Sequence, residues 1–288
     1  MLKIIAALVI TLVGGTGLLY IEYCWFDTEN CPFNAASLTD SDNIPPAVTV
    51  ATVTNPVPSS DCSKTRLVDQ QLVDDDCQPM INPLRFKINY LYREGGQGDF
   101  RSFGEGSVLH SGDSLKLLFK PTEAAYVYIF MVDAHGNIGR LFPTGNFKGA
   151  SQLNRNPVQK GMQYFVPAPQ KSFRLDRNTG EESIYFIATR QADEVLEQQY
   201  QKLFVAQQAK EVETIILIQE KIIIEFEKKE KQRLIEPELV TDVVSDEQPT
   251  SFEEAGQKFS VLPAYLNNLC EGCVYRVTFK HDSIAFPD

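Results

Sequence analysis

Alternating apolar and polar residues dominate the middle of the chain and predict β-strands. Residues 84–90 alternate as a half-buried strand does, whereas residues 126–132 are apolar on both faces, as in a central strand. Asp133-Ala134-His135-Gly136-Asn137 predicts a tight turn, after which residues 138–142 return as the hairpin partner. Further strands are expected at 115–119, 163–166, 172–175, 183–189 and, near the carboxyl end, 277–282. This spacing is typical of a β-sandwich.

A helical pattern interrupts the strands over residues 191–236. Apolar side chains fall on one stripe separated by Glu, Gln and Lys, and Pro237 ends the run. The spacing slips around residues 207–210, so one bent helix or two shorter helices fit equally well. The segment either packs on a sheet face or recruits a partner as a surface helix. The acidic residues 237–258 are expected to form a loop.

The first 83 residues follow neither pattern. Residues 4–21 carry no charge and are flanked by Lys3 and Glu22, and as a helix they would rise ~27 Å, close to the thickness of a bilayer core. Residues 1–26 therefore predict a signal anchor, with a cleaved signal peptide as the alternative. Residues 27–83, rich in Asp, Ser, Thr and Pro, predict an extended stalk, with one short strand at 48–53 and a solvated turn at Asp74-Asp75-Asp76.

The expected fold class is mainly β with an added helical segment. A β-sandwich-like domain over residues 84–288, with a helical insertion at about 191–236, follows the N-terminal transmembrane anchor and the stalk. The basic residue before the apolar run and the acidic residues after it predict an inner-membrane anchor with the bulk of the chain in the periplasm or outside the cell, or secretion if the signal is cleaved.

Six cysteines agree with export, because disulfides form in oxidising compartments. Proximity in sequence suggests three pairs, although six cysteines allow 15 connectivities. The candidate pairs are Cys24 with Cys31, Cys62 with Cys77, and Cys270 with Cys273. Cys270-Glu271-Gly272-Cys273 is also the spacing of a redox motif, but such motifs open a helix after a strand, and this one precedes an apparent strand.

Charge and composition exclude several classes of function. The formal net charge of −11 argues against broad binding to nucleic acid. Three scattered histidines do not suggest a metal centre, and residues 95–98 lack the Lys-Ser/Thr of a phosphate-binding loop. We therefore expect no metal and no cofactor.

An ordered set of short motifs between residues 109 and 186 resembles a known bacterial family. The motif residues are Ser111, Gly112 and Asp113; Tyr126, Tyr128 and Phe130; Asp133 and Gly136; Leu141, Phe142 and Pro143; and Gly180 and Glu181. Their order, with residues 156–158, 161, 164, 167, 173–176 and 185–186 between and after them, is similar to the "domain of unknown function 4384" family, and the likeness resumes at residues 277–282. The resemblance implies a β-sandwich-like accessory module that is often joined to separate catalytic domains.

No catalytic constellation is evident from the sequence. The three histidines lack the surroundings of a known nucleophile motif, and the carboxylates Asp113, Asp133, Asp176, Glu181 and Glu182 fall mostly at predicted turns. We therefore expect a non-enzymatic envelope adaptor that contacts the membrane through its anchor and binds another envelope protein. Two alternatives are a thiol-disulfide redox protein using Cys270 and Cys273, and a module that binds wall glycan or another extracellular ligand through Tyr90, Tyr92, Phe100 and Phe103.

Overall fold

A computed structural model describes residues 83–143, 151, 153–232, 235–241 and 248–283, together with the backbone of residues 66–68 and 71–73. Several predictions lie outside these residues: the anchor, the strand at 48–53, the turn at 74–76, and the pairs Cys24–Cys31 and Cys62–Cys77. Within the described part, no helix is both long enough and apolar enough to cross a membrane.

The chain divides into two units, of which residues 33–82 are one. The two strands described in it, β1 (Arg66–Val68) and β2 (Gln71–Val73), pair antiparallel. The extended stalk over residues 27–83 stays a prediction.

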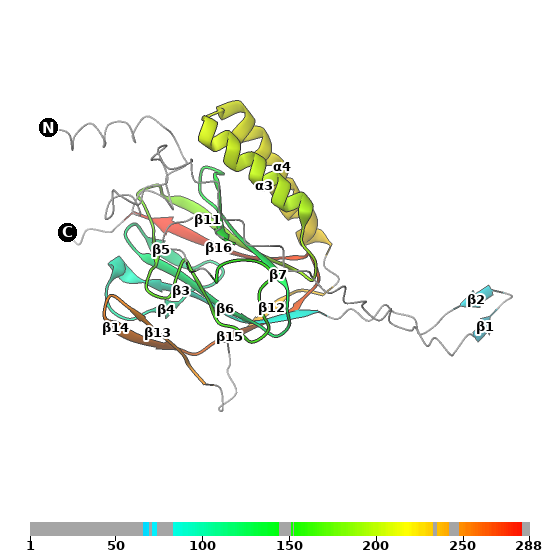
Figure 1. The fold of residues 1–288 in the computed structure, drawn as a ribbon, viewed down its shortest axis with the longest axis horizontal. Helices are drawn as coiled ribbons and strands as arrows, with labels where there is room; N and C mark the ends of the chain where they lie inside the picture. Colours follow the sequence, from blue (N-terminus) through cyan, green and yellow to red (C-terminus); the bar gives the residue numbers. More distant parts are fainter. Residues whose placement is uncertain are drawn as a thin grey trace, which may run out of the picture. The chain divides into compact units, whose positions relative to one another are not determined.

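The main body is mainly β, with two large sheets and two helices, in agreement with the expected fold class at this level (Figure 1). The seven-stranded sheet has the order β10-β6-β3-β15-β12, with β9 also on β6 and β4 also on β3. Its strands are β3 (Leu84–Arg93), β4 (Arg101–Ser102), β6 (Ser114–Pro121), β9 (Tyr164–Val166), β10 (Phe173–Arg174), β12 (Glu238–Val240) and β15 (Ala264–Leu269). A short 3-10 helix, η2 (Glu94–Gly96), follows β3.

The five-stranded sheet has the order β5-β16-β11-β7-β8. Its strands are β5 (Val108–His110), β7 (Tyr126–Val132), β8 (Ile138–Phe142), β11 (Gly180–Thr189) and β16 (Val274–Asp282). All neighbours are antiparallel except β5 and β16. The predicted hairpin of β7 and β8 is confirmed, and Gly136 in its turn has φ 80°, a conformation that glycine adopts without steric cost.

One apolar core lies between the two sheets. It takes alternate residues of β3 and β6 from one sheet, such as Phe86 and Phe119, and alternate residues of β7 and β11 from the other, such as Ile129 and Phe186. The rings of Phe86, Phe119 and Phe186 meet edge to face, an arrangement that aromatic pairs favour. The period-2 pattern thus places one face of each strand in a shared core.

Two helices, α3 (Glu194–Ala209) and α4 (Val212–Lys231), cover the outer face of the five-stranded sheet (Figure 1). Strand β7 is apolar on both faces because Tyr128 and Phe130 point away from the shared core and pack against Tyr200 and Phe226 of the helices. Lys210, with φ 58°, ends α3 in the left-handed conformation. The slip in helical spacing at residues 207–210 therefore marks a break between two helices.

The prediction of a loop over residues 237–258 is wrong. This region holds β12 and β13 (Thr250–Glu254), and β13 pairs with β14 (Gln257–Val261) through a turn in which Ala255 and Gly256 both have positive φ. Phe252 and Phe259 pair across this hairpin and pack on Phe100 and Leu118, on the outer face of the seven-stranded sheet. Because acidic residues predominate in this region, its composition did not predict that Phe252 and Phe259 bury one face of a hairpin.

Candidate functional site

Most of the motif residues outside the strand interiors converge at one end of the five-stranded sheet. Here β5 ends at His110, β16 ends at Asp282 and β11 begins at Gly180. Gly180 lies so close to Ala134 of the β7–β8 turn that a Cβ atom at this position would collide with the Ala134 side chain. The sheet register therefore brings together segments that are far apart in the sequence.

A buried chain of polar side chains occupies this end of the core. Ser111 Oγ lies 3.1 Å from His281 Nε2, and His281 Nδ1 lies 2.7 Å from Glu182 Oε1. His281 and Glu182 are fully buried, and Ser111 is 8% exposed. Glu182 and His281 are diagonal neighbours on adjacent strands, since Glu182 pairs with Phe279 and Gly180 with His281. The order serine, imidazole, carboxylate is that of a catalytic triad.

The surroundings of Ser111 do not provide the other half of a hydrolytic site. In acyl transfer, backbone N–H groups near the nucleophile stabilise the oxyanion. Here the N–H of Ser111 donates to Asp282 O and the N–H of Gly112 donates to Leu175 O, both at 2.9 Å. These two amides are therefore engaged within the fold, and the chain Ser111–His281–Glu182 ties β5, β16 and β11 to one another.

Carboxylates at this end accept hydrogen bonds from backbone N–H groups, as the sequence predicted. Asp113 accepts from the N–H groups of Gly95 and His110, and Asp133 accepts from those of His135 and Asn137. Burial raises the pKa of Asp176, although its carboxylate accepts two hydrogen bonds from Asn178. Burial also raises the pKa of Glu182. Nowhere in the described residues do three or more His, Cys, Asp or Glu side chains form a group that could hold a metal ion.

Cys270 and Cys273 form a disulfide in the turn between β15 and β16, with their Cα atoms 5.2 Å apart. The Cys273 N–H donates to Cys270 O, and the Gly272 N–H donates to Ala188 O, so the turn is held against β11. Glu271 lies between the two cysteines and pairs with Arg190 at 3.1 Å. The disulfide thus belongs to a β-turn and not to the start of a helix.

A second buried polar cluster lies beneath the β13–β14 hairpin. Lys116 of β6 is fully buried, and its Nζ lies 2.7 Å from Glu254 Oε2 of β13. Ser172 donates to the same carboxylate at 2.9 Å, and Arg93 approaches it at 3.5 Å. Burial lowers the pKa of Lys116 to about 8, against the opposing effect of Glu254.

Aromatic rings and carbonyl groups complete the surroundings of Lys116. The ammonium group lies 5.0 Å from the centre of the Phe252 ring and donates to Ala168 O and Pro169 O at 2.9 and 2.8 Å. The sequence did not reveal this cluster, because its members come from strands that are far apart in the chain and from a segment expected to be a loop.

The aromatic residues considered for glycan binding lie mostly inside the protein. Tyr90, Phe100 and Phe103 are buried, and Tyr92 is partly buried against the main core. Burial raises the pKa of Tyr90 well above its usual range. These rings pack the fold and do not form an exposed platform for a sugar.

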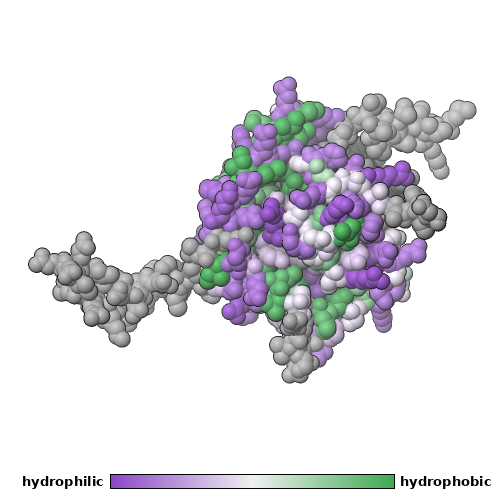
Figure 2. All heavy atoms as spheres, turned by 180° about the vertical axis from the view of Figure 1, so that it is seen from behind, coloured by the Kyte–Doolittle hydropathy of each residue, from purple (hydrophilic) through white to green (hydrophobic). Residues whose placement is uncertain are grey.

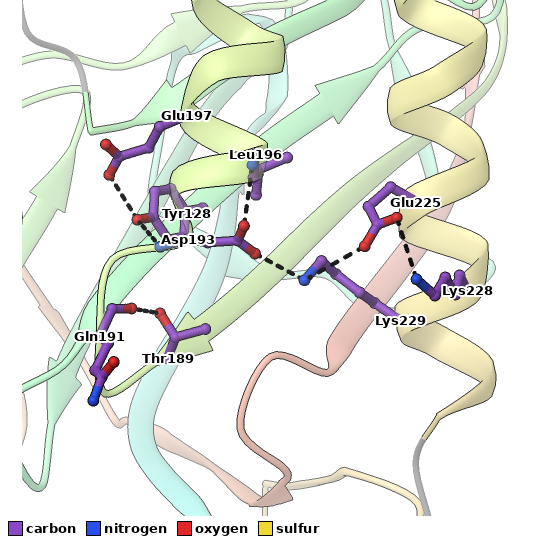
Figure 3. Close-up of polar contacts among 9 residues, drawn as sticks. All are labelled: Tyr128, Thr189, Gln191, Asp193, Leu196, Glu197, Glu225, Lys228 and Lys229. Atoms are coloured by element: carbon purple, nitrogen blue, oxygen red, sulfur yellow. Dashed lines mark hydrogen bonds and ion pairs between the residues drawn. The ribbon is translucent and has the colours of Figure 1, made fainter.

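Polar contacts fix the base of the helical hairpin to the sheet (Figure 3). The Tyr128 hydroxyl of β7 donates to Glu197 at 2.7 Å and accepts from the Asp193 N–H at 3.0 Å. Asp193 caps α3 by accepting from the Leu196 N–H, and it also pairs with Lys229 of α4 at 2.8 Å. Both helices are therefore attached to one point on the sheet.

The surface of the hairpin carries apolar patches among polar side chains (Figure 2). Ten large apolar side chains are exposed in the described residues, and six of them lie on these two helices. The six are Val195 and Val205 on α3, and Val212, Ile216, Leu217 and Ile224 on α4. A groove of about 330 Å³ lies between the helices, lined by Val205, Ala206 and Ile218 among others. This surface is the strongest candidate for contact with a partner.

The fold and its buried sites define a mainly β domain with a helical hairpin on one sheet and a β-hairpin on the other. Residues 108–192 match the family described as "Domain of unknown function (DUF4384)". The chain therefore resembles this family over the segment from β5 to the end of β11, as the ordered motifs predicted. No curated protein matches the chain, and no solved structure matches it.

The association of Ser111, Glu182 and His281 was missed in the sequence. Ser111 is a motif residue of the resemblance, Glu182 directly follows the motif residue Glu181, and His281 lies in the segment where the likeness resumes. The resumption of the likeness at residues 277–282 was the one signal in the sequence that His281 lies close to the motif residues. His110 and His135 stay apart from the cluster, His110 at the end of β5 and His135 in the exposed turn after β7.

Proposed function

We propose that the chain is an exported, membrane-anchored bacterial accessory module that binds another envelope protein and performs no catalysis of its own. The docking surface in this proposal is the outer face of the α3–α4 hairpin. The observation that carries it is the concentration of exposed apolar side chains on these two helices, six of ten in the described residues.

The two faces of the hairpin differ in a way that supports a binding role. The inner face packs Leu196, Leu203 and Ile222 against the sheet in an apolar cluster of its own. The outer face presents Val205 and Val212, each more than half exposed, beside the groove or near it. Exposed apolar residues on a fixed helical pair are typical of protein–protein contact surfaces.

The Ser111–His281–Glu182 chain favours a second candidate, a serine hydrolase, by its connectivity alone. The engaged amides of Ser111 and Gly112 and the burial of His281 count against it. A structural role for this chain is consistent with the binding module.

The experiment compares crosslinking and co-purification of full-length wild-type protein with two sets of variants in native membranes. Val205→Glu and Val212→Glu place a charge at the groove end of the hairpin. Val108→Glu and Leu262→Glu place the same charge at exposed apolar positions outside the helices. We expect one protein, identified by mass spectrometry, to be lost from the first set and retained in the second. Loss from both sets, or from neither, would reject the hairpin as the docking surface.

A further inference from the structure

The solvent side of α4 carries a stripe in which apolar and charged residues are arranged symmetrically about its centre. Leu217 and Ile224 are seven residues apart, so they lie two turns apart on one side of the helix. Both are more than half exposed. Glu220 and Lys221 lie midway between them and are exposed.

Along the same stripe, acidic residues lie toward the N-terminal end and basic residues toward the C-terminal end. Glu213 lies one turn before Leu217, and Lys228 lies one turn after Ile224. With 100° per residue these six positions span about 100° of the helix circumference. Glu213, Glu220 and Lys221 make no ion pair with other described residues, and the only such pair of Lys228 is with Glu225 at 3.9 Å on its own helix.

We propose that this stripe binds the same stripe of a second copy of the chain, with the two α4 helices antiparallel about a two-fold axis between Glu220 and Lys221. This inference goes beyond the proposed function, because the stripe lies on α4 alone and its occupant is a second copy of the chain. In this register Leu217 faces Ile224 of the second copy, and each contact occurs twice by symmetry.

The charges favour this arrangement over a shifted register and over a parallel orientation. Antiparallel pairing places Glu213 opposite Lys228 and Glu220 opposite Lys221, so that every facing charged pair on the stripe is of opposite sign. A register shifted by one residue places Glu220 opposite itself and Glu213 opposite Glu227. Parallel helices would place each charge opposite its own copy. The stripe is thus complementary to itself in one orientation.

Two crossed helices bury less than the ~800 Å² per partner of a typical stable interface. We therefore expect a weak dimer with a dissociation constant on the order of micromolar, which a high local concentration would populate.

The test uses two differently tagged copies of the full-length chain, co-expressed and purified through one tag. Glu213→Lys alone, present in both copies, sets two positive charges against each other at the contact with Lys228, and we expect recovery of the second tag to fall about tenfold. Lys228→Glu alone, in both copies, should have the same effect. A Glu213→Lys copy paired with a Lys228→Glu copy has charges of opposite sign at both contacts, so this mixed pair should associate as well. The rescue variant is the double reversal Glu213→Lys with Lys228→Glu in both copies, which also restores opposite signs at both contacts. We expect its recovery to return to within about threefold of wild type.

Lys160→Glu is the matched control, because it reverses an exposed charge outside both helices. It should leave recovery unchanged, and circular dichroism of every variant should match wild type. Equal recovery of all variants, or failure of the double reversal to associate, would overturn the antiparallel second copy. In the same purifications, Val205→Glu tests the proposed function separately, through loss of the partner protein. The envelope-protein partner and the second copy can therefore be rejected independently.

Discussion

His281 Nδ1 lies 2.7 Å from Glu182 Oε1, and both side chains are fully buried at the end of the core between the two sheets. The pair links β16, near the carboxyl end, to β11, ninety-nine residues earlier in the chain. Because His281 Nδ1 and Glu182 Oε1 pair away from water, removal of one side chain leaves a buried polar group without this partner.

We expect His281→Leu, which keeps most of the side-chain volume, to lower the free energy of unfolding by about 3–5 kcal/mol. Chemical denaturation measures this difference. His281→Leu combined with Glu182→Leu removes both polar groups and should recover a large part of the loss. Lys280→Ala, at an exposed neighbour, should change stability by less than about 0.5 kcal/mol. Additive losses in the double variant would contradict the pairing.

The raised pKa of Glu182 predicts a pH dependence. Because burial raises the pKa of this carboxyl in the folded state, the folded chain binds the proton more tightly than the unfolded chain does. The contribution of Glu182 to stability is therefore fully present below its ordinary pKa of 4.5 and falls as pH rises through the folded pKa. Glu182→Gln cannot titrate, so its stability relative to wild type should rise with pH over this window. Parallel pH profiles from denaturation at pH 4 to 8 would exclude the shift.

Ser111 should not react as a nucleophile. A fluorophosphonate probe labels serines that a histidine activates within an accessible oxyanion site, and here the amides of Ser111 and Gly112 already donate to carbonyls. We expect no adduct on Ser111 by mass spectrometry of the folded protein, with Ser111→Ala as the control for background. Stoichiometric labelling that Ser111→Ala abolishes would instead establish the hydrolase candidate.

The sequence predicted local elements well where one strand or helix carries its own signal. The alternation at residues 84–90 and the apolar run at 126–132 are β3 and β7, and the helical stripe is α3 and α4. The sequence did not predict elements whose stability depends on contacts with distant parts of the chain. Residues 250–261 form a hairpin because Phe252 and Phe259 find a surface on the seven-stranded sheet, and no local pattern reveals that surface.

In the candidate sites too, the sequence predicted contacts between near neighbours and did not predict contacts between distant residues. The disulfide of Cys270 and Cys273 and the turn carboxylates Asp113 and Asp133 depend on near neighbours, and the sequence predicted both kinds of contact. Ser111 meets His281 only through the parallel pairing of β5 with β16, two strands from opposite ends of the described body. Pairings of this kind are set by the whole sheet, so the motif residues could be found in the sequence but their association could not.

Cys270 and Cys273 should act as a structural bridge. The closed loop has only four residues, so the chain-entropy model gives a contribution of about 2 kcal/mol to stability. We expect Cys270→Ser with Cys273→Ser to lower stability by about that amount, and we expect the wild-type protein to show no insulin reductase activity above a no-protein blank. Reductase activity that Cys273→Ser abolishes would support the redox alternative.

The ion pair of Lys116 and Glu254 predicts both a coupling energy and a pH effect. Lys116→Met leaves Glu254 buried without its closest cation, so we expect a loss of about 3–5 kcal/mol. Lys116→Met with Glu254→Met replaces the pair by apolar groups beside Phe100 and Phe252 and should lose much less than the sum of the single changes. A double-mutant cycle by chemical denaturation measures the difference. Glu253→Gln, at an exposed neighbour on β13, is the control.

The pH effect follows from the lowered pKa of Lys116. The folded chain releases this proton near pH 8, whereas the unfolded chain keeps it to about pH 10.5. Between these values the unfolded state binds more protons, so the contribution of Lys116 to stability increases with pH. Wild type should therefore become more stable relative to Lys116→Met as pH rises from 8 to 10. A difference that stays constant over this range would show that Lys116 keeps an ordinary pKa, and a difference that shrinks would show a raised pKa. Either result would contradict the lowered pKa.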